Sequence, residues 1–449
     1  MTFDGRTAES LFCDAALVSA LLLVGQVLRA KIALLQKLRF PASLTAGLLA
    51  LAFGPNGMQW IPLSKQLASY PSLLVILVFA AVPIGAKFAD RKRLGGDVGE
   101  MWSHVSFGIL AQYGWGMLLG LFVLGAFWEL HPGFGLVLGL GFFGGPGTAA
   151  AAGSSFKAHH WDDALSLGMT SATVGIVAAI VGGIILANWG RRKGLCQGAD
   201  PSEADAEQGL LTGLIPERSR KPLGVETVSS SSLDTVSFHL SLIMIAAISG
   251  WYGSKFFKTL WPSVEIPAFG LALIAGYLLQ GSLKITGTDR HVDQRIVSRL
   301  SGTTVDYLVA LGIAAIEVPR VIQYAVPLGF LFAFGVILCL LQALVLGPRM
   351  FREYWFEKST FVWGFNTGTL AQSVMLLRMI DPGTKSRSLE IYGLVDMLIK
   401  PFSLGCLVAG PALISAGYAV HFAVVCSILA FAPLVLAKAV GWWNPGRKK

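Results

Sequence analysis

Asp396 and Lys400 are two of the few ionisable side chains within the apolar stretches of this sequence, and they lie four residues apart. On a helix this spacing places both side chains on one face, where they can pair. Charged groups inside a membrane are costly and are therefore functional candidates. Two interpretations are equally open: Asp396 takes part in coupling to a cation or proton, or the pair is purely structural. A sharper hypothesis is that the ammonium of Lys400 takes the place of a bound sodium ion.

The segment GFFGGPGTAAAAGSSF, residues 141–156, places glycines and a proline in the middle of an apolar stretch. A glycine inside a helix costs roughly 1 kcal/mol relative to alanine, and a proline roughly 3 kcal/mol. The pattern therefore predicts a break between two half-helices. The free NH groups and the dipole at a helix N-terminus suit an anion such as a carboxylate. This predicts a substrate-binding role for Gly144, Gly145, Gly147 and Thr148.

A matching segment, WGFNTGTLAQ, begins at Trp363 in the second half of the chain. It predicts a second group of substrate-binding residues: Asn366, Thr367, Gly368 and Thr369. Thr148, Thr369 and Asn366 can add side-chain hydrogen bonds, and unwound backbone carbonyls would suit Na⁺. The simpler alternatives are that the glycines only allow close helix packing and that Thr148 and Thr369 only cap their half-helices.

Other residue patterns do not indicate an active site or a resident metal. The five cysteines form no CxxC pair, no HExxH motif occurs, and no nucleophile stands beside a base at a usable spacing. His159, His160, Asp162 and Asp163 could bind a metal, although a solvated loop is the favoured interpretation. We therefore predict no enzyme activity, no metal site and no cofactor.

Composition places the chain among membrane proteins. Of its 449 residues, 54% are hydrophobic and 14% are charged, and apolar runs of the length that a membrane requires recur throughout. The fold class predicted is an all-α polytopic membrane protein. The expected spans are Asp14–Gln36, Pro41–Phe53, Pro71–Lys87, Val105–Trp128, Ala164–Trp189, Phe238–Phe257, Pro267–Leu283, Thr304–Val318, Ile322–Leu346, Leu389–Ser415 and Ala419–Val440.

The basic residues predict an orientation in the membrane. With the N-terminus outside, the clusters at 31–39, 87–93, 191–193, 284–299, 349–358 and 447–449 all fall in the cytoplasm, as the positive-inside rule requires. This accounts for the net charge of +9 without a nucleic-acid partner. The rule also indicates that the segment 134–156 does not cross the membrane but enters from outside and turns back at GGPG.

The two halves of the chain repeat this pattern. We expect a first repeat at 1–190 with a re-entrant loop near 134–156, and a flexible cytoplasmic linker at 191–237. A second repeat at 238–415 has its re-entrant loop near 359–380, and an extra helix with a basic tail follows at 416–449. Because each half holds an odd number of spans, the second copy is expected to be inverted. Paired broken segments of this kind indicate a secondary transporter with a site near the midplane.

The sequence resembles the bacterial sodium/glutamate symporters over nearly its full length, apart from the linker and the last span. The features that carry this resemblance are FFGGPGTAAAAG, the SATVG motif at Ser171–Gly175, the proline-led span at Pro41, and Asp396. The second tip departs from the family pattern, because it has GFNTG where members have GGxG. Pro146 also stands at a position that is polar in the family.

The resemblance implies an inverted-repeat fold with a scaffold part and a transport part, and a homodimer in the plasma membrane. It also implies cation-coupled uptake of an acidic amino acid, most simply glutamate with Na⁺ or H⁺, by an elevator mechanism. Ion-coupling residues would then include Asp396, Lys400 and Thr173. The departures leave a dicarboxylate, a hydroxycarboxylate or another organic anion open as the substrate. A channel or a membrane-embedded enzyme is a weaker alternative.

Overall fold

The computed structural model describes residues 5–38, 40–64, 66–85, 96–196, 212, 214–215, 217, 220, 222–260, 266–381 and 385–443. Within these residues the secondary structure is helical, without strands. Residues 197–211 of the linker expected at 191–237, the basic cluster at 87–93 and the tail at 447–449 lie outside the described residues.

Eight helices in the described part of the chain are long and apolar enough to cross a membrane. They are Ala8–Lys31, Gly96–Ala126, Ala164–Arg192, Thr235–Leu260, Ala268–Ile285, Gln294–Ala314, Ala325–Met350 and Leu398–Ala439. The predicted all-α polytopic class is confirmed. Two expected spans are shorter helices, α3 (Ala42–Phe53) and α4 (Tyr70–Ala81), of 12 residues each. At 1.5 Å per residue each reaches about 18 Å, which is less than the hydrocarbon thickness.

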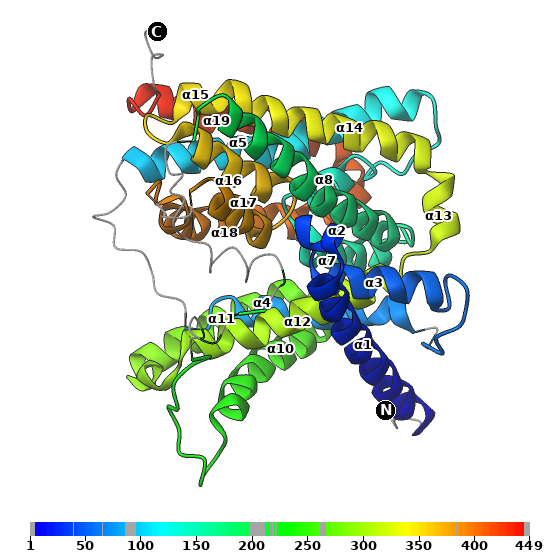
Figure 1. Cartoon of the computed structure of the whole chain (residues 1–449). Coiled ribbons are helices and arrows are strands. Elements are labelled where there is room, and N and C mark those ends of the chain that lie inside the picture. The colour runs from blue at the N-terminus through cyan, green and yellow to red at the C-terminus, as the bar shows by residue number, and fades with distance from the viewer. Residues whose placement is uncertain are drawn as a thin grey trace.

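The helices form two bundles (Figure 1). The first bundle, in the lower part of the figure, contains α1 (Gly5–Lys31), α3, α4, α10 (Thr235–Leu260), α11 (Ala268–Ile285) and α12 (Gln294–Ala314). The second bundle contains α5 (Gly96–Leu118), α6 (Leu136–Gly141), α7 (Gly145–Ala158), α8 (Ala164–Arg192), α14 (Ala325–Leu341), α16 (Trp355–Thr367), α17 (Leu370–Ile380), α18 (Ser388–Leu413) and α19 (Ala419–Ala439). The bundles meet where α7 packs on α4 and α12.

The segment with GGPG is a helix–break–helix unit. Helix α6 ends at Gly141 and α7 begins at Gly145, with Pro146 in its first turn, where proline is tolerated. The outer ends of this unit lie side by side: the ring of His131, before α6, is 5.9 Å from the ring of Phe156, near the end of α7. The chain therefore folds back at the break, and we call this unit hairpin 1.

The segment around Gly368 is also broken. Helix α16 ends at Thr367 and α17 begins at Leu370. The two arms pack closely: if Gly364 of α16 carried a Cβ atom, that atom would lie only 2.8 Å from the Cα of Ser373 in α17. Gly364 precedes Gly368 by four residues, and Ser373 follows Thr369 by four. The two arms are therefore antiparallel, and we call this unit hairpin 2.

Both hairpins pack on the long helix α8, at opposite ends. Hairpin 1 contacts the first half of α8, where Gly168 faces Ala149 of α7. Hairpin 2 contacts the second half, where Gly182 and Gly183 face Trp363 of α16 and Leu376 of α17. Small residues allow this close approach between helices. The tips of both hairpins are thereby directed toward the middle of α8.

Candidate functional site

The tips of the two hairpins touch. Gly145, the first residue of α7, has φ +65°, a conformation that glycine adopts without strain. A Cβ at this position would lie 3.0 Å from the Cγ2 of Thr369 and 3.8 Å from the carbonyl oxygen of Gly368. Three residues of the predicted site, Gly145, Gly368 and Thr369, are thus brought together from segments more than 200 residues apart in the sequence.

The N-termini of α7 and α17 therefore meet at one point. Each of these helix ends presents amide NH groups without intrahelical partners and the positive end of a helix dipole. The side chain of Thr369 accepts the NH of Ala371 at 3.3 Å, and Gln372 Oε1 accepts the NH of Thr369 at 3.0 Å. This capping box satisfies part of the α17 terminus. The paired dipoles favour a negatively charged group between the tips.

Gly147 lies on the open side of the break. A Cβ on Gly147 would meet no atom within 4 Å, whereas a Cβ on Gly145 would touch the other hairpin. Thr148 is half-buried next to Gly147, and its hydroxyl donates to the carbonyl oxygen of Leu140 at 2.5 Å, with that of Gly145 as a second acceptor at 3.1 Å. The structure thus shows Thr148 bracing the break, with its oxygen still able to accept a hydrogen bond.

The predicted pair between Asp396 and Lys400 is formed in α18. The Nζ of Lys400 lies 2.6 Å from the Oδ2 of Asp396, and the hydroxyl of Tyr392 donates to the Oδ1 of Asp396 at 3.2 Å. The ring of Tyr392 packs 4.9 Å from the ring of Phe365 in α16. The pair is therefore attached to the last turns of α16, close to the tip of hairpin 2.

Three other predicted site residues form hydrogen bonds away from the point where the tips touch. Asn366 is fully buried and donates through Nδ2 to Gln342 Oε1 at 2.8 Å. The hydroxyl of Thr367 donates to the carbonyl of Trp363 within its own helix at 2.6 Å. The hydroxyl of Thr173, in α8, likewise donates to the carbonyl of Met169 at 2.8 Å. None of these three hydrogen bonds reaches α7 or α17.

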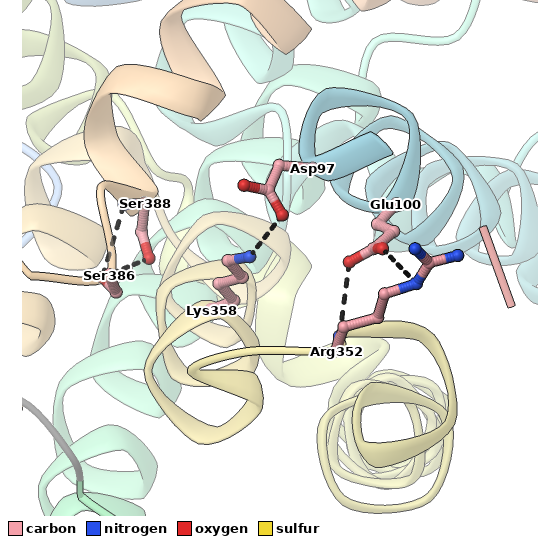
Figure 2. A network of polar contacts seen from close by, with 6 residues as sticks. All are labelled: Asp97, Glu100, Arg352, Lys358, Ser386 and Ser388. Atoms are coloured by element: carbon pink, nitrogen blue, oxygen red, sulfur yellow. Dashed lines mark hydrogen bonds and ion pairs between the residues drawn. The ribbon is translucent and has the colours of Figure 1, made fainter. Parts of the chain in front are cut away.

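A buried polar stripe on α5 was not foreseen. Glu100, His104 and Gln112 are each no more than 1% exposed and recur at helical spacing on one face. Figure 2 shows the N-terminal end of α5, where Glu100 lies 3.3 Å from Arg352. Next to it, Asp97 lies 3.1 Å from Lys358, which is almost fully buried. The sequence signal for the stripe was the spacing of its three residues, four and eight positions apart, which places them on one side of a helix.

The same stripe is linked to the tip of hairpin 2. Gln342 donates through Nε2 to the His104 carbonyl at 2.6 Å and accepts the Asn366 amide at 2.8 Å. Gln112 donates through Nε2 to the Asn366 carbonyl at 2.7 Å. The middle of α5 and the tip of hairpin 2 therefore belong to one hydrogen-bonded chain.

Asp163 belongs to the loop considered above as a possible metal site, and here it pairs with residues of a neighbouring helix. Its carboxylate lies 2.6 Å from Arg320 and accepts the hydroxyl of Tyr324 at 3.2 Å. The hydrogen bond to Asp163 raises the pKa of Arg320, and burial, together with the Asp163 carboxylate, raises the pKa of Tyr324. Asp163 thus ties the start of α8 to α13 (Val318–Gln323), the helix that precedes α14.

An all-helical membrane protein with two broken helices that meet at their tips has the architecture of a secondary transporter. Comparison with protein families agrees: the profile described as sodium/glutamate symporter matches residues 10–371. The chain belongs to the sodium/glutamate symporter family, so it is a cation-coupled transporter with several membrane spans. No curated protein matches the chain.

Proposed function

We propose that this protein takes up glutamate with Na⁺ across the plasma membrane, by alternating access of the elevator type. The observation that carries the proposal is the contact between the N-termini of α7 and α17 at Gly145 and Thr369, because the positive ends of two helix dipoles meet there. A carboxylate of the substrate would accept hydrogen bonds from these helix ends. The substrate-binding residues proposed are Gly144, Gly145, Gly147, Thr148, Asn366, Thr367, Gly368 and Thr369.

The ion-coupling residues proposed are Asp396, Lys400 and Thr173. Asp396 is favoured because its carboxylate is only partly covered and lies next to the residues that pack on α16. Lys400 already supplies one positive charge to it at 2.6 Å. This arrangement supports the hypothesis that the ammonium stands where a coupling sodium ion would otherwise bind.

The elevator mechanism is supported by the division into two bundles. The second bundle carries both hairpins, and α7 is the main element that contacts the first bundle. A movement of the second bundle along α4 and α12 would carry the site across the membrane. We further propose a homodimer, an outside N-terminus, a cytoplasmic linker and C-terminus, and inverted repeats with the boundaries expected above.

Uptake of radiolabelled glutamate into proteoliposomes tests the proposal. We expect accumulation that requires an inward Na⁺ gradient, that saturates with substrate, and that shows counterflow, as a carrier does and a channel does not. Unlabelled citrate and malate are added as competitors, because the second tip has GFNTG in place of the family pattern and the substrate could therefore be another organic anion. If glutamate neither enters nor competes, the proposed substrate is wrong. If citrate or malate then enters instead, the carrier mechanism survives with another anion.

A further inference from the structure

Two amide oxygens lie buried next to the tip of hairpin 2 without a hydrogen-bond partner among the described residues. They are Oε1 of Gln112, in α5, and Oδ1 of Asn366, in the last turn of α16. Both residues are 0% exposed. An amide oxygen without a partner in an apolar interior is costly, so each such atom in a folded protein requires an explanation.

The orientation of both amides is fixed by their nitrogen atoms. Gln112 Nε2 donates to the Asn366 carbonyl at 2.7 Å, so the reverse orientation would place two oxygens against each other. Asn366 Nδ2 donates to Gln342 Oε1 at 2.8 Å, and Gln342 is held in turn because its own Nε2 donates to the His104 carbonyl. Rotating one amide would therefore disrupt the others, and the two oxygens stay free.

The surroundings of these oxygens favour a positive charge. Helix α16 ends at Thr367, so its last carbonyls lack intrahelical donors and mark the negative end of the helix dipole. Gly175 of α8 lies against the Thr367 carbonyl, and Gly108 of α5 lies against the Asn366 amide. No side chain at these two positions separates the helices, and Gln112 is in direct contact with the end of α16 through the hydrogen bond to the Asn366 carbonyl. The two free oxygens therefore belong to residues that touch each other at the negative end of α16.

We propose that Gln112 Oε1 and Asn366 Oδ1 are ligands of a dehydrated Na⁺ ion at the end of α16. Neutral oxygen atoms suit a hard cation, and a site without a carboxylate suits a single charge better than Ca²⁺ or Mg²⁺, whose sites rely on carboxylates. The inference rests on the proposed Na⁺ coupling and assigns residues to it. Because Thr369 follows this turn by two residues, bound Na⁺ would order the tip that contacts Gly145, and so favour substrate binding.

The site is tested by the melting temperature of the purified protein without glutamate, in NaCl and in choline chloride. We expect Na⁺ to raise the Tm of the wild type more than choline does, through binding to the folded state. In Gln112→Leu the Na⁺ concentration that gives half of this shift should rise about 10- to 100-fold, which is typical for the loss of one oxygen contact to a charge. Gln112→Glu retains an oxygen for the ion but loses the hydrogen bond to the Asn366 carbonyl, so it should keep the Na⁺ shift on a lower Tm.

Gln280→Leu is the matched control. Gln280 is also buried, in α11, but its Oε1 accepts the NH of Gly85 at 2.8 Å. Its replacement should lower the Tm equally in both salts and leave the Na⁺ response unchanged. If Gln112→Leu does not fold, Asn366→Leu, which removes the other proposed oxygen, takes its place and should weaken the Na⁺ response in the same way. Asn366→Asp keeps an oxygen and should retain the Na⁺ shift.

Three results would overturn the site: no Na⁺-specific shift in the wild type, an unchanged Na⁺ response in Gln112→Leu, or a response lost equally in Gln112→Glu and Asn366→Asp. The last result would show that these amides act only through their NH groups. If the Na⁺ shifts are as expected but no glutamate is taken up, the cation site is supported and the proposed substrate is wrong.

Discussion

Gly145 and Gly147 are two residues apart in hairpin 1 but have different surroundings. Gly145 has φ +65° and faces Thr369, whereas Gly147 faces open space. We expect Gly145→Ala to destabilise the protein by about 1 to 2 kcal/mol, the cost of left-handed backbone for a residue with a Cβ, and to weaken glutamate uptake. Gly147→Ala should keep the melting temperature but raise the KM for glutamate, because its methyl group would enter the substrate space.

Thermal unfolding and uptake kinetics of the two variants separate these effects. If both variants lose the same amount of stability, the left-handed backbone of Gly145 is not what stabilises the tip. An unchanged KM in Gly147→Ala would place the substrate elsewhere.

Lys400 is the residue whose charge can be tested most directly. If its ammonium takes the place of a sodium ion, Lys400→Ala exposes Asp396 to the solution ion, and uptake should need one more Na⁺. We expect the Hill coefficient for Na⁺ to rise by up to one. The half-saturating Na⁺ concentration should increase about fivefold, because a partly exposed ion pair contributes up to about 1 kcal/mol.

Lys400→Arg keeps the positive charge and serves as the control, with a sodium dependence close to that of the wild type. A sodium dependence that is the same in Lys400→Ala and in the wild type would contradict the substitution of Na⁺ by the ammonium and favour a structural pair.

At the scale of helices, the sequence predicted what depends on local residues. Helix α8 was expected from Ala164 to Trp189 and runs to Arg192, because a long apolar run has few alternatives in a membrane. The breaks at Gly145 and Gly368 were predicted because glycine and proline act on their own backbone. The chain of hydrogen bonds from His104 to Asn366 was not predicted. Gln112 and Asn366 are 254 residues apart in the sequence, and only the packing of α5 on hairpin 2 brings them together.

The outer end of hairpin 1 contains a histidine that should make stability depend on pH. The ring of His131 stacks 4.1 Å from that of Trp161, and its Nδ1 accepts the NH of Gly133 at 3.0 Å. Burial lowers the pKa of His131, with the Asp163 carboxylate acting in the opposite direction. The unfolded chain therefore binds more protons near pH 6.5. This contribution to stability is present above that pH and is lost as the pH falls toward the folded-state pKa.

We expect the melting temperature of the wild type to fall from pH 8 to pH 5.5. His131→Phe keeps an aromatic ring against Trp161 but does not titrate, so its melting temperature should fall less over the same range. Parallel pH profiles for the two proteins would assign the acid sensitivity to other groups.

At the scale of the whole molecule, the two bundles differ in what holds them together. Within the first bundle, α10 packs along α11, and a Cβ on Gly253 would lie 4.0 Å from the Cβ of Leu271. Between the bundles, Gly312 of α12 faces Met169 of α8, and a Cβ on Gly312 would lie 3.6 Å from the Met169 Cγ. These two contacts respond differently if one bundle slides along the other.

A cross-link between the bundles should therefore stop transport. We expect the pair Gly312→Cys and Met169→Cys, in a background without the five native cysteines, to lose most glutamate uptake on oxidation and to regain it on reduction.

The pair Gly253→Cys and Leu271→Cys is the control, because its Cβ separation suits a disulfide and both residues belong to one bundle. Oxidation of this pair should leave uptake unchanged. Transport that persists with a fully formed cross-link between Gly312→Cys and Met169→Cys would mean that the bundles need not move at this contact. Local opening of the hairpins would then have to expose the site to both sides, without displacement of the second bundle along α12.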